Sequence, residues 1–340
     1  MTPAPLRLRL DGTALVSNWR TLDRMSGAAA CGAAVKADAY GLGVRDVARR
    51  LAGAGCRDFF VATWAEAEAL AGLGLTVSVL HGLRAQDPAG LPHARPVLNT
   101  PGQVRRWREA GGGACDVMVD TGMNRLGLSI DDIASGLLDG LAIETLLSHL
   151  ACAEEESPMN RRQRDGFAAL QGRTGAKRMS LANSAGIALG PDYAFDLTRP
   201  GVALYGGRPT AAFGAIRQVV TPETQVLQRR TVRAGHTVGY NATWTAPADT
   251  EVAILNIGYA DGYLRCFSGK GLALAGEAKL PVLGRVSMDL AAIDVTAAPE
   301  LAEGDWVTIA YDLPETARLS GLSQYELLTG LGDRFDRVWD

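Results

Sequence analysis

The sequence lacks the features that mark exported, membrane-bound and metal-binding proteins. Its five cysteines are scattered, odd in number and never spaced C-x-x-C, which argues against a disulfide framework or a zinc site. No apolar run is long enough to cross a bilayer, and the N-terminal stretch lacks the apolar core of a signal peptide. We therefore expect a cytoplasmic protein with no resident metal and no membrane partner.

The sequence also lacks a basic excess, a repeat of fixed period and any low-complexity segment. Lysine and arginine number 34 against 37 aspartates and glutamates, so the formal net charge is -3 and nucleic acid is not an expected partner. Hydrophobic residues make up 47% of the 340 positions, as in ordinary soluble globular proteins. This length exceeds the usual size of a single core, so we expect a large domain and a smaller one.

Short apolar runs alternate with segments of helical period between residues 27 and 206. This alternation is typical of repeated βα units on a parallel sheet. The predicted strands cover residues 31–36, 58–62, 76–80, 95–98, 115–119, 143–148, 178–182 and 196–204. Eight such units in roughly 200 residues favour a (β/α)8 barrel of the TIM type over a doubly wound sheet.

Several helices are predicted from their ends. Thr63 and Glu66 have the spacing of a capping box, and Thr100 precedes Pro101 as an N-cap precedes a proline in the first helical turn. Val44, Val47, Ala48 and Leu51 form one apolar stripe, which predicts a helix packed on the sheet.

The sequence pattern changes after residue 212 to alternating strands with Gly, Asp and Pro turns, as in "HTVGYNATW", "TEVAILNIGYADG" and "EGDWVTIAYD". We therefore predict an α/β barrel domain over residues 1–212 and a mainly-β domain over residues 213–340. We also expect the N-terminal residues, to about residue 10, to pair with the second domain.

Polar residues are predicted at the carboxyl ends of the barrel strands, where βα barrels place their catalytic groups. Lys36 ends the first predicted strand within the small, apolar run "CGAAVKADAYGLG". Apolar surroundings lower the pKa of a lysine and favour Schiff-base chemistry, but an ammonium that simply reaches solvent is the alternative. The later strands are followed by, or contain, Arg125, His149, Asn183, Ser184 and Arg199.

Two of these residues also have structural interpretations. Taken alone, a histidine such as His149 is more often a hydrogen-bonded structural residue than a catalyst, and Ser184 alone is also consistent with a helix cap. The segments "ANSAG" and "RPGVALYGG" follow the last two strands, the usual phosphate site of such barrels. A phosphate site together with a nucleophilic amine suggests pyridoxal phosphate.

The complete set of motifs resembles the alanine racemase family over almost the entire chain. The motifs are, in order, "AVKADAYGLG", "VDTGMNRLG", "SHLACAEE", "LANSAG", "TRPGVALYG", "IGYADGY" and "GRVSMD". The resemblance implies a barrel followed by a C-terminal β domain. It also implies an isomerase that interconverts L- and D-alanine with pyridoxal 5'-phosphate, a homodimer with shared active sites, and D-alanine biosynthesis for the cell wall.

The resemblance also implies roles for individual residues. Lys36 resembles the lysine that forms the internal aldimine, and Tyr259 the second catalytic base of the two-base mechanism, contributed in the family by the other subunit. Arg199 resembles the arginine at the pyridine nitrogen, and His149 the histidine hydrogen-bonded to it. The expected phosphate ligands are Tyr40, Ser184, the backbone of Gly201 and Val202, and Tyr325, with Asn183 also counted as cofactor-binding. The expected substrate-binding residues are Arg125, Met288 and Asp289.

The sequence departs from the family pattern near Arg125. Many relatives carry a carbamate-modified lysine two residues before the aspartate of "VDTG", whereas this chain has Met118. A thioether forms no carbamate, so we predict none here, with chloride or another carboxylate as its substitute beside Arg125. Asn124 and Leu42 replace a glycine and a histidine that are frequent in relatives.

Three alternative functions stay open on the sequence. A racemase that also accepts serine differs from an alanine racemase only in a small pocket. A barrel-type decarboxylase or aldolase generally places an acidic residue at the pyridine nitrogen, which Arg199 argues against. A non-enzymatic pyridoxal phosphate carrier of this barrel type lacks the second domain. A biosynthetic and a catabolic role are not separated by these motifs.

Overall fold

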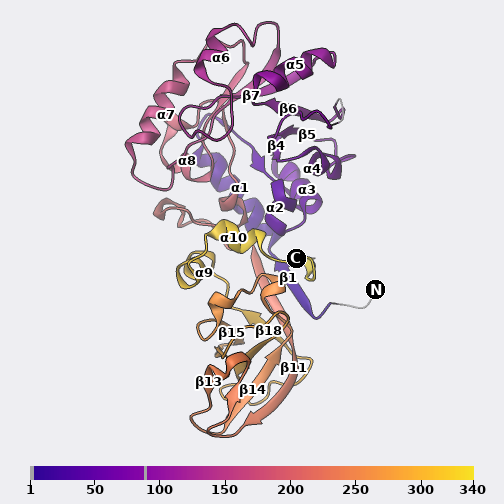
Figure 1. Ribbon diagram of the computed structural model, residues 1–340, viewed down its shortest axis with the longest axis vertical. Coiled ribbons are helices and arrows are strands. Elements are labelled where there is room, and N and C mark those ends of the chain that lie inside the picture. Colours follow the sequence, from indigo (N-terminus) through magenta and orange to yellow (C-terminus); the bar gives the residue numbers. More distant parts are fainter. Residues whose placement is uncertain (1–3, 88–89) are drawn as a thin grey trace. The chain divides into compact units, whose positions relative to one another are not determined.

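The computed structural model describes residues 4–87 and 90–340 (Figure 1). The chain divides into two compact units, of which one spans Thr13–Arg217. The other combines Gln218–Asp340 with the N-terminal segment that ends at Gly12. We call them the barrel unit and the β unit.

The barrel unit is built on parallel strands that follow one another along the chain. Its strands are β2 (Ala30–Cys31), β3 (Ala33–Ala34), β4 (Asp58–Val61), β5 (Thr76–Val79), β6 (Ala94–Leu98), β7 (Ala114–Met118), β8 (Ala142–Leu147), β9 (Arg178–Ser180) and β10 (Leu197–Thr198). The segment around β10 completes the ring. The N–H of Arg199 donates to the carbonyl of Ala182 (2.8 Å), and that of Gly32 to the carbonyl of Thr198 (2.9 Å). The predicted α/β barrel fold is therefore confirmed.

Two predicted strands are shorter than expected. The predicted strand 31–36 is divided into β2 and β3, and Lys36 begins a helical turn instead of ending a strand. The predicted strand 196–204 is limited to β10, because Val202–Tyr205 form a 3₁₀ helix, η2. Pro200 and Gly201 account for this second difference, since proline has no N–H to donate to a ladder and glycine weakens a strand.

The helices of the barrel unit begin where the capping signals predict. Thr63 Oγ1 accepts from the N–H of Glu66 (3.3 Å), and the Glu66 carboxylate accepts from the N–H of Thr63 (3.3 Å). Thr100 caps the helix that starts at Pro101. The helices are α1 (Gly12–Met25), α2 (Lys36–Gly41), α3 (Val44–Ala54), α4 (Trp64–Ala69), α5 (Pro101–Glu109), α6 (Ile130–Ala134), α7 (Pro158–Ala168) and α8 (Ser184–Ala188), with 3₁₀ turns η1 (Pro191–Tyr193), η2 and η3 (Ala211–Phe213).

The barrel interior contains a buried apolar cluster of five side chains, one from each of five strands: Phe60, Val97, Met118, Leu147 and Leu197. Because the five strands lie around the ring, side chains from all of them can form one cluster only on its inner face. Met118, which is 8% exposed, is one of its members. The position at which many relatives carry a carbamate is therefore part of the apolar packing of this barrel.

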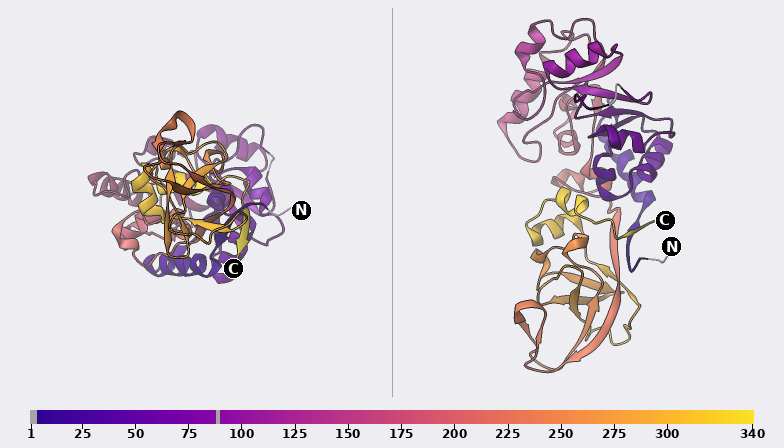
Figure 2. Two further views of the ribbon diagram at one scale, coloured as in Figure 1. Left: turned by 90° about the horizontal axis from the view of Figure 1, so that it is seen from below. Right: turned by 45° about the vertical axis from the view of Figure 1, so that its right-hand side comes forward.

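The β unit is mainly β, as predicted, with a mainly antiparallel sheet of eight strands and a separate antiparallel pair, β12 and β13, in its described residues (Figures 1 and 2). Its strands are β1 (Leu6–Leu10), β11 (Val220–Val232), β12 (Thr237–Val238), β13 (Trp244–Thr245), β14 (Thr250–Leu255), β15 (Leu272–Ala275), β16 (Ala278–Leu283), β17 (Ala291–Asp294), β18 (Trp306–Ile309) and β19 (Asp336–Trp339). The long strand β11 pairs with both β14 and β18, which closes part of the sheet into a ring. β1 lies between β11 and β19, so the first and the last described strands pair in the larger sheet.

Short helical segments complete the β unit. They are α9 (Leu313–Ser320) and α10 (Gln324–Thr329), with 3₁₀ turns η4 (Tyr240–Ala242), η5 (Tyr259–Asp261) and η6 (Arg265–Phe267). Across the residues that the structure describes, no helix in either unit has the length and apolar character to cross a bilayer.

Candidate functional site

Lys36 opens a turn of unusual backbone conformation. The next four residues, Ala37–Tyr40, all have left-handed φ values between +52° and +57°. Each left-handed position costs an L-residue about 1–2 kcal/mol, and such strain persists only where surrounding contacts impose it. The segment labelled α2 is therefore a strained left-handed turn directly after Lys36.

Two carboxylates hold this turn in place. Glu66 Oε1 accepts from the N–H of Ala37 (2.9 Å), and its Oε2 accepts from the N–H of Ala62 (2.6 Å). Asp38 Oδ1 accepts from the N–H of Val44 at the start of α3 (2.7 Å). Glu66, the third residue of α4 and a member of its capping box, thus also fixes the backbone beside Lys36.

The Lys36 side chain has no hydrogen bond or ion pair to any residue within 4–87 and 90–340. Its pKa is lowered, first by desolvation and then by the positive charge of Arg125 and, less, of Arg199, while the charge of Glu66 opposes the shift. A lowered pKa makes the neutral, nucleophilic amine more accessible.

Arg199 is a buried cation in the same barrel, with 6% of its surface exposed. Its Nη2 donates to the carbonyl of Ser148 (2.6 Å), and its Nη1 donates to Ser180 Oγ, which in turn donates to the carbonyl of Leu197. None of the carboxylates in the described chain forms an ion pair with this guanidinium. Burial lowers the pKa of Arg199 to about 10, and the charge of Asp116 opposes the shift, so the side chain stays protonated at neutral pH.

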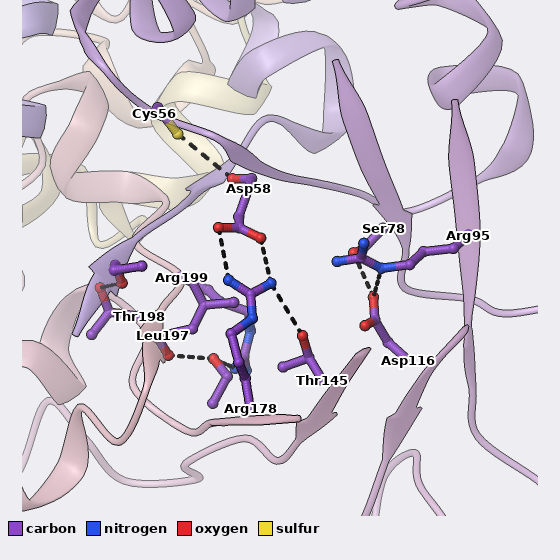
Figure 3. Close-up of polar contacts among 12 residues, drawn as sticks. Cys56, Asp58, Ser78, Arg95, Asp116, Thr145, Arg178, Leu197, Thr198 and Arg199 are labelled. Carbon is purple, nitrogen blue, oxygen red and sulfur yellow. Dashed lines mark hydrogen bonds and ion pairs between the residues drawn. The ribbon is translucent and has the colours of Figure 1, made fainter. Parts of the chain in front are cut away.

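Charged pairs line the barrel interior near Arg199 (Figure 3). Arg178 binds both carboxylate oxygens of Asp58 (2.6 and 3.1 Å), and Arg95 Nε donates to Asp116 Oδ2 (2.8 Å). Asp116 is fully buried, and its Oδ2 also accepts from Ser78 Oγ (2.6 Å). The interior of this barrel therefore combines an apolar cluster with paired charges, whereas Arg199, like Lys36, has no paired carboxylate among the described residues.

Three of the expected phosphate ligands lie together. Ser184 Oγ accepts from the N–H of Gly201 (2.9 Å) and of Ala203 (3.3 Å). A Cβ at Gly201 would lie 2.2 Å from the hydroxyl of Tyr40, so only glycine permits this approach. Val202 is buried, and in the described part of the chain its N–H makes no recorded hydrogen bond. The Ser184 hydroxyl and the Tyr40 phenol thus lie beside the backbone of Gly201, which Val202 follows, and together these groups are a donor set suited to an anion.

His149 is an uncharged residue, and Asn183 caps a helix. Burial and the charges of Arg199 and Arg125 lower the pKa of His149 to about 3, so its ring is neutral at physiological pH. Asn183 is the N-cap of α8, and its Oδ1 accepts from the N–H of Gly186 (2.8 Å).

Arg125 lies in the exposed loop after β7. Asp120 shapes this loop by accepting from the N–H of Gly122 (2.7 Å) and of Arg125 (3.1 Å). Asn124 has a φ of +55°, which asparagine tolerates better than most residues and which explains how it replaces a glycine. Across the described ranges, the guanidinium of Arg125 forms no ion pair.

The remaining expected site residues belong to the β unit, where three of them meet. Tyr259 begins η5, and its N–H donates to the carbonyl of Ser287 (3.0 Å), while the N–H of Ala260 donates to that of Met288 (3.0 Å). Arg265 lies over the Tyr259 ring, with its guanidinium carbon 5.2 Å from the ring centroid. Met288 and Asp289 are exposed beside this turn, and Tyr325 lies in α10.

Sequence reasoning missed several residues that hold the expected site residues. Ser180 contacts Arg199, Glu66 contacts the Lys36 turn, and Arg334 forms ion pairs with Asp261 and Asp289 beside Tyr259. Glu66 was recognisable only as a cap, and no sequence signal singled out Arg334. In the described chain no cluster of His, Cys, Asp and Glu is arranged to hold a metal.

Comparisons with known proteins agree with this description. A family model described as "Alanine racemase, N-terminal domain" matches residues 10–209, and one described as "Alanine racemase, C-terminal domain" matches residues 219–339. An alanine racemase of Acidiphilium cryptum is 41% identical over 97% of this chain and 98% of its own length. A biosynthetic alanine racemase of Agrobacterium fabrum is 42% identical over 99% and 94%.

Solved structures show the same similarity. The alanine racemase of Bartonella henselae with covalently bound pyridoxal phosphate has a TM-score of 0.90 and 34% identity, covering 99% of this chain and all of its own. The biosynthetic alanine racemase of Pseudomonas aeruginosa has a TM-score of 0.89 and 31% identity, covering 99% of both chains.

Proposed function

This chain belongs to the alanine racemase family and interconverts L- and D-alanine with pyridoxal phosphate as its cofactor; from this premise we propose that Lys36 and Tyr259 are its two acid–base groups. Racemisation removes a proton from one face of Cα and delivers another to the opposite face, so two groups must flank the reacting carbon. Lys36, once its amine is neutral, exchanges the proton on one face, and the Tyr259 phenol exchanges it on the other.

The residues of the barrel unit fit the cofactor. The observation that carries the proposal is the convergence of an amine of lowered pKa at Lys36, an unpaired buried cation at Arg199, and the Tyr40, Ser184 and Gly201 cradle. When bound, pyridoxal phosphate withdraws electrons from Cα and so makes its proton acidic. Lys36 would hold the cofactor covalently, and the cradle would bind its phosphate.

The other residues receive supporting roles in this proposal. Arg199 would contact the pyridine nitrogen, and His149, which is neutral, would add no second positive charge beside it. Arg125, Met288 and Asp289 bind substrate. Tyr40, Asn183, Ser184, Gly201, Val202 and Tyr325 hold the cofactor.

The barrel unit would therefore bind the cofactor, and the β unit would supply the tyrosine. We propose a homodimer in which Tyr259 of one subunit serves the barrel of the other, on the strength of the family resemblance. Sedimentation over a range of concentrations tests it, because a monomer with full activity contradicts the shared site.

Many relatives balance the charge of the arginine at the position of Arg125 with a carbamate, which this chain lacks. We propose that chloride or another carboxylate, such as that of the substrate, takes its place beside Arg125. Support comes from Met118, which fills the carbamate position with an apolar side chain, and from the absence of an ion pair on Arg125 in the described residues. Anomalous scattering from crystals soaked in bromide locates a halide at this site, and a modified side chain at residue 118 would refute the idea.

A biosynthetic role in the cytoplasm, supplying D-alanine to the cell wall, is the second part of the proposal. It is supported by two relatives whose names include "biosynthetic" and by five free cysteines. Expression in a bacterium that requires external D-alanine should restore growth without the supplement. Growth that still needs D-alanine, with active protein in the cells, contradicts this role.

The first experiment measures both antipodes by chiral chromatography after the holoenzyme is incubated with L-alanine, D-alanine, L-serine or D-serine. Alanine should converge to nearly equal antipodes, and the serine rate sets the breadth of specificity. Lys36→Ala should abolish conversion, whereas Lys177→Ala, at an exposed lysine of the same unit, should not.

Tyr259→Phe should lose turnover but keep the bound cofactor, and Tyr193→Phe is its matched control. A yellow protein that leaves alanine enantiopure would contradict racemisation and favour a carrier. Release of carbon dioxide without antipode formation would favour a decarboxylase.

A further inference from the structure

The turn that carries Tyr259 is fixed on one side by the segment 287–289. The N–H groups of Tyr259 and Ala260 donate to the carbonyls of Ser287 and Met288, each at 3.0 Å. A Cβ at Gly258 would lie 2.3 Å from the Met288 carbonyl oxygen, so the two backbones approach as closely as glycine allows. The position of the phenol therefore depends on where this segment lies.

The same turn is fixed on its other side by the segment 330–334. Gly262 has a φ of +89°, and a Cβ there would lie 2.3 Å from the carbonyl oxygen of Gly330. The N–H of Gly332 donates to the carbonyl of Asp261 (3.3 Å). Tyr259 thus sits on a turn held between two stretches of chain that are distant from it in sequence.

Arg334 joins all three segments through one guanidinium. Its Nε and Nη2 donate to Oδ1 and Oδ2 of Asp261 (2.7 and 2.9 Å), and its Nη1 donates to Asp289 Oδ1 (2.7 Å). The Asp261 carboxylate is buried, and its Oδ2 also accepts from the N–H of Gly258 (3.0 Å). One planar cation therefore connects the tyrosine's own turn to the segment that accepts its N–H.

We propose that Arg334 is a positioning residue that sets the location of the Tyr259 phenol. The inference rests on the proposed role of Tyr259 as one of the two acid–base groups. A guanidinium presents its donors in a rigid plane, so the bidentate pair with Asp261 and the bond to Asp289 together fix the turn's orientation. A lysine ammonium keeps the charge but reproduces neither the fork nor the third contact.

Displacement of the phenol should slow proton transfer more than it weakens substrate binding. A misplacement of about 1 Å costs up to roughly a hundredfold in rate, so kcat of Arg334→Lys should fall between about tenfold and a hundredfold. The KM for alanine should change by less than about threefold, because Arg334 is not proposed to touch substrate.

Isotope effects in the two directions separate positioning from general damage. In the direction in which Tyr259 removes the Cα proton, slowing its step should raise the primary effect of α-deuterated alanine on kcat/KM. In the reverse direction Lys36 removes the deuteron, so a slower tyrosine step should lower the corresponding effect. A structural role, which only reduces the fraction of active protein, leaves both effects unchanged.

The experiment compares the holoenzyme with Arg334→Lys, Asp261→Asn and Arg318→Lys. Asp261→Asn removes the charge from the bidentate pair with Arg334 and should show the same pattern, which keeps the test available if Arg334→Lys does not fold. Arg318 pairs with Glu315 on the exposed surface of α9 and is the matched control, with both isotope effects at wild-type values.

The outcomes are distinct. Opposite changes of the two isotope effects support the positioning role. Unchanged effects, or changes of the same sign, overturn it even if kcat falls. Full activity of Tyr259→Phe would instead contradict the proposed function, whereas inactive, cofactor-bound Tyr259→Phe with unchanged isotope effects in Arg334→Lys contradicts only this inference.

Discussion

Removal of the Ser180 hydroxyl should destabilise the barrel unit more than removal of an ordinary buried hydroxyl. Ser180 Oγ accepts from the cationic Nη1 of Arg199 and donates to the carbonyl of Leu197, and all of these groups are buried. Ser180→Ala leaves one guanidinium N–H and one carbonyl without partners in a region closed to water. The other guanidinium contact, to the Ser148 carbonyl, cannot serve both donors.

The expected loss follows from the two bonds. A hydrogen bond to a charged group contributes about 1.5–3 kcal/mol, and a neutral one about 1, so Ser180→Ala should cost about 2.5–4 kcal/mol. A unit of this size loses roughly 2–4 °C of Tm per kcal/mol, which predicts a fall of roughly 5–16 °C.

Thermal unfolding of the cofactor-free protein, followed by circular dichroism and calorimetry, measures this loss. Ser26→Ala is the matched control, because Ser26 Oγ is equally buried, donates to the Leu22 carbonyl and pairs with Thr198 Oγ1 (2.8 Å) without contacting a charge. Its expected cost is about 1–2 kcal/mol. Equal losses in the two variants would refute the reasoning that the buried charge of Arg199 makes the difference.

Three further outcomes are expected. Lys36→Met should raise the Tm of the cofactor-free protein at pH 7, because desolvation lowers the pKa of Lys36 in the folded state and its charge therefore destabilises that state. The gain in Tm should shrink as pH rises toward 10.5, where the amine of the unfolded chain also loses its proton. The pKa of His149 is lowered to about 3, so the wild type should lose stability as pH falls from 6.5 toward 3, and His149→Gln should flatten that part of a plot of Tm against pH. Gly201→Ala places a Cβ against the Tyr40 hydroxyl and should weaken pyridoxal phosphate affinity in a fluorescence titration at least tenfold (~1.4 kcal/mol), whereas unchanged affinity would contradict the cradle.

Local features of the fold were predictable because they depend on near neighbours in sequence. The Thr63 capping box, the helix start at Pro101 and the alternation of strands with helices all follow from patterns within a few residues. The strand predicted over 196–204 was too long because the apolar residues after Gly201 suit a buried 3₁₀ helix as well as a strand.

The sequence by itself determined the order of the units, the helix caps and the residue types that this chemistry requires, since these depend on local propensity and on motifs. Only the tertiary structure decided how those residues are held. Ser180 bonds a side chain 19 residues away, Glu66 a backbone 29 residues away, and Arg334 a carboxylate 73 residues away. No local pattern encodes such contacts, because folding brings the partners together only when strands and turns from distant parts of the chain pack. The left-handed turn after Lys36 has the same origin: its strain is unfavourable locally and persists because Glu66 and Asp38 hold it.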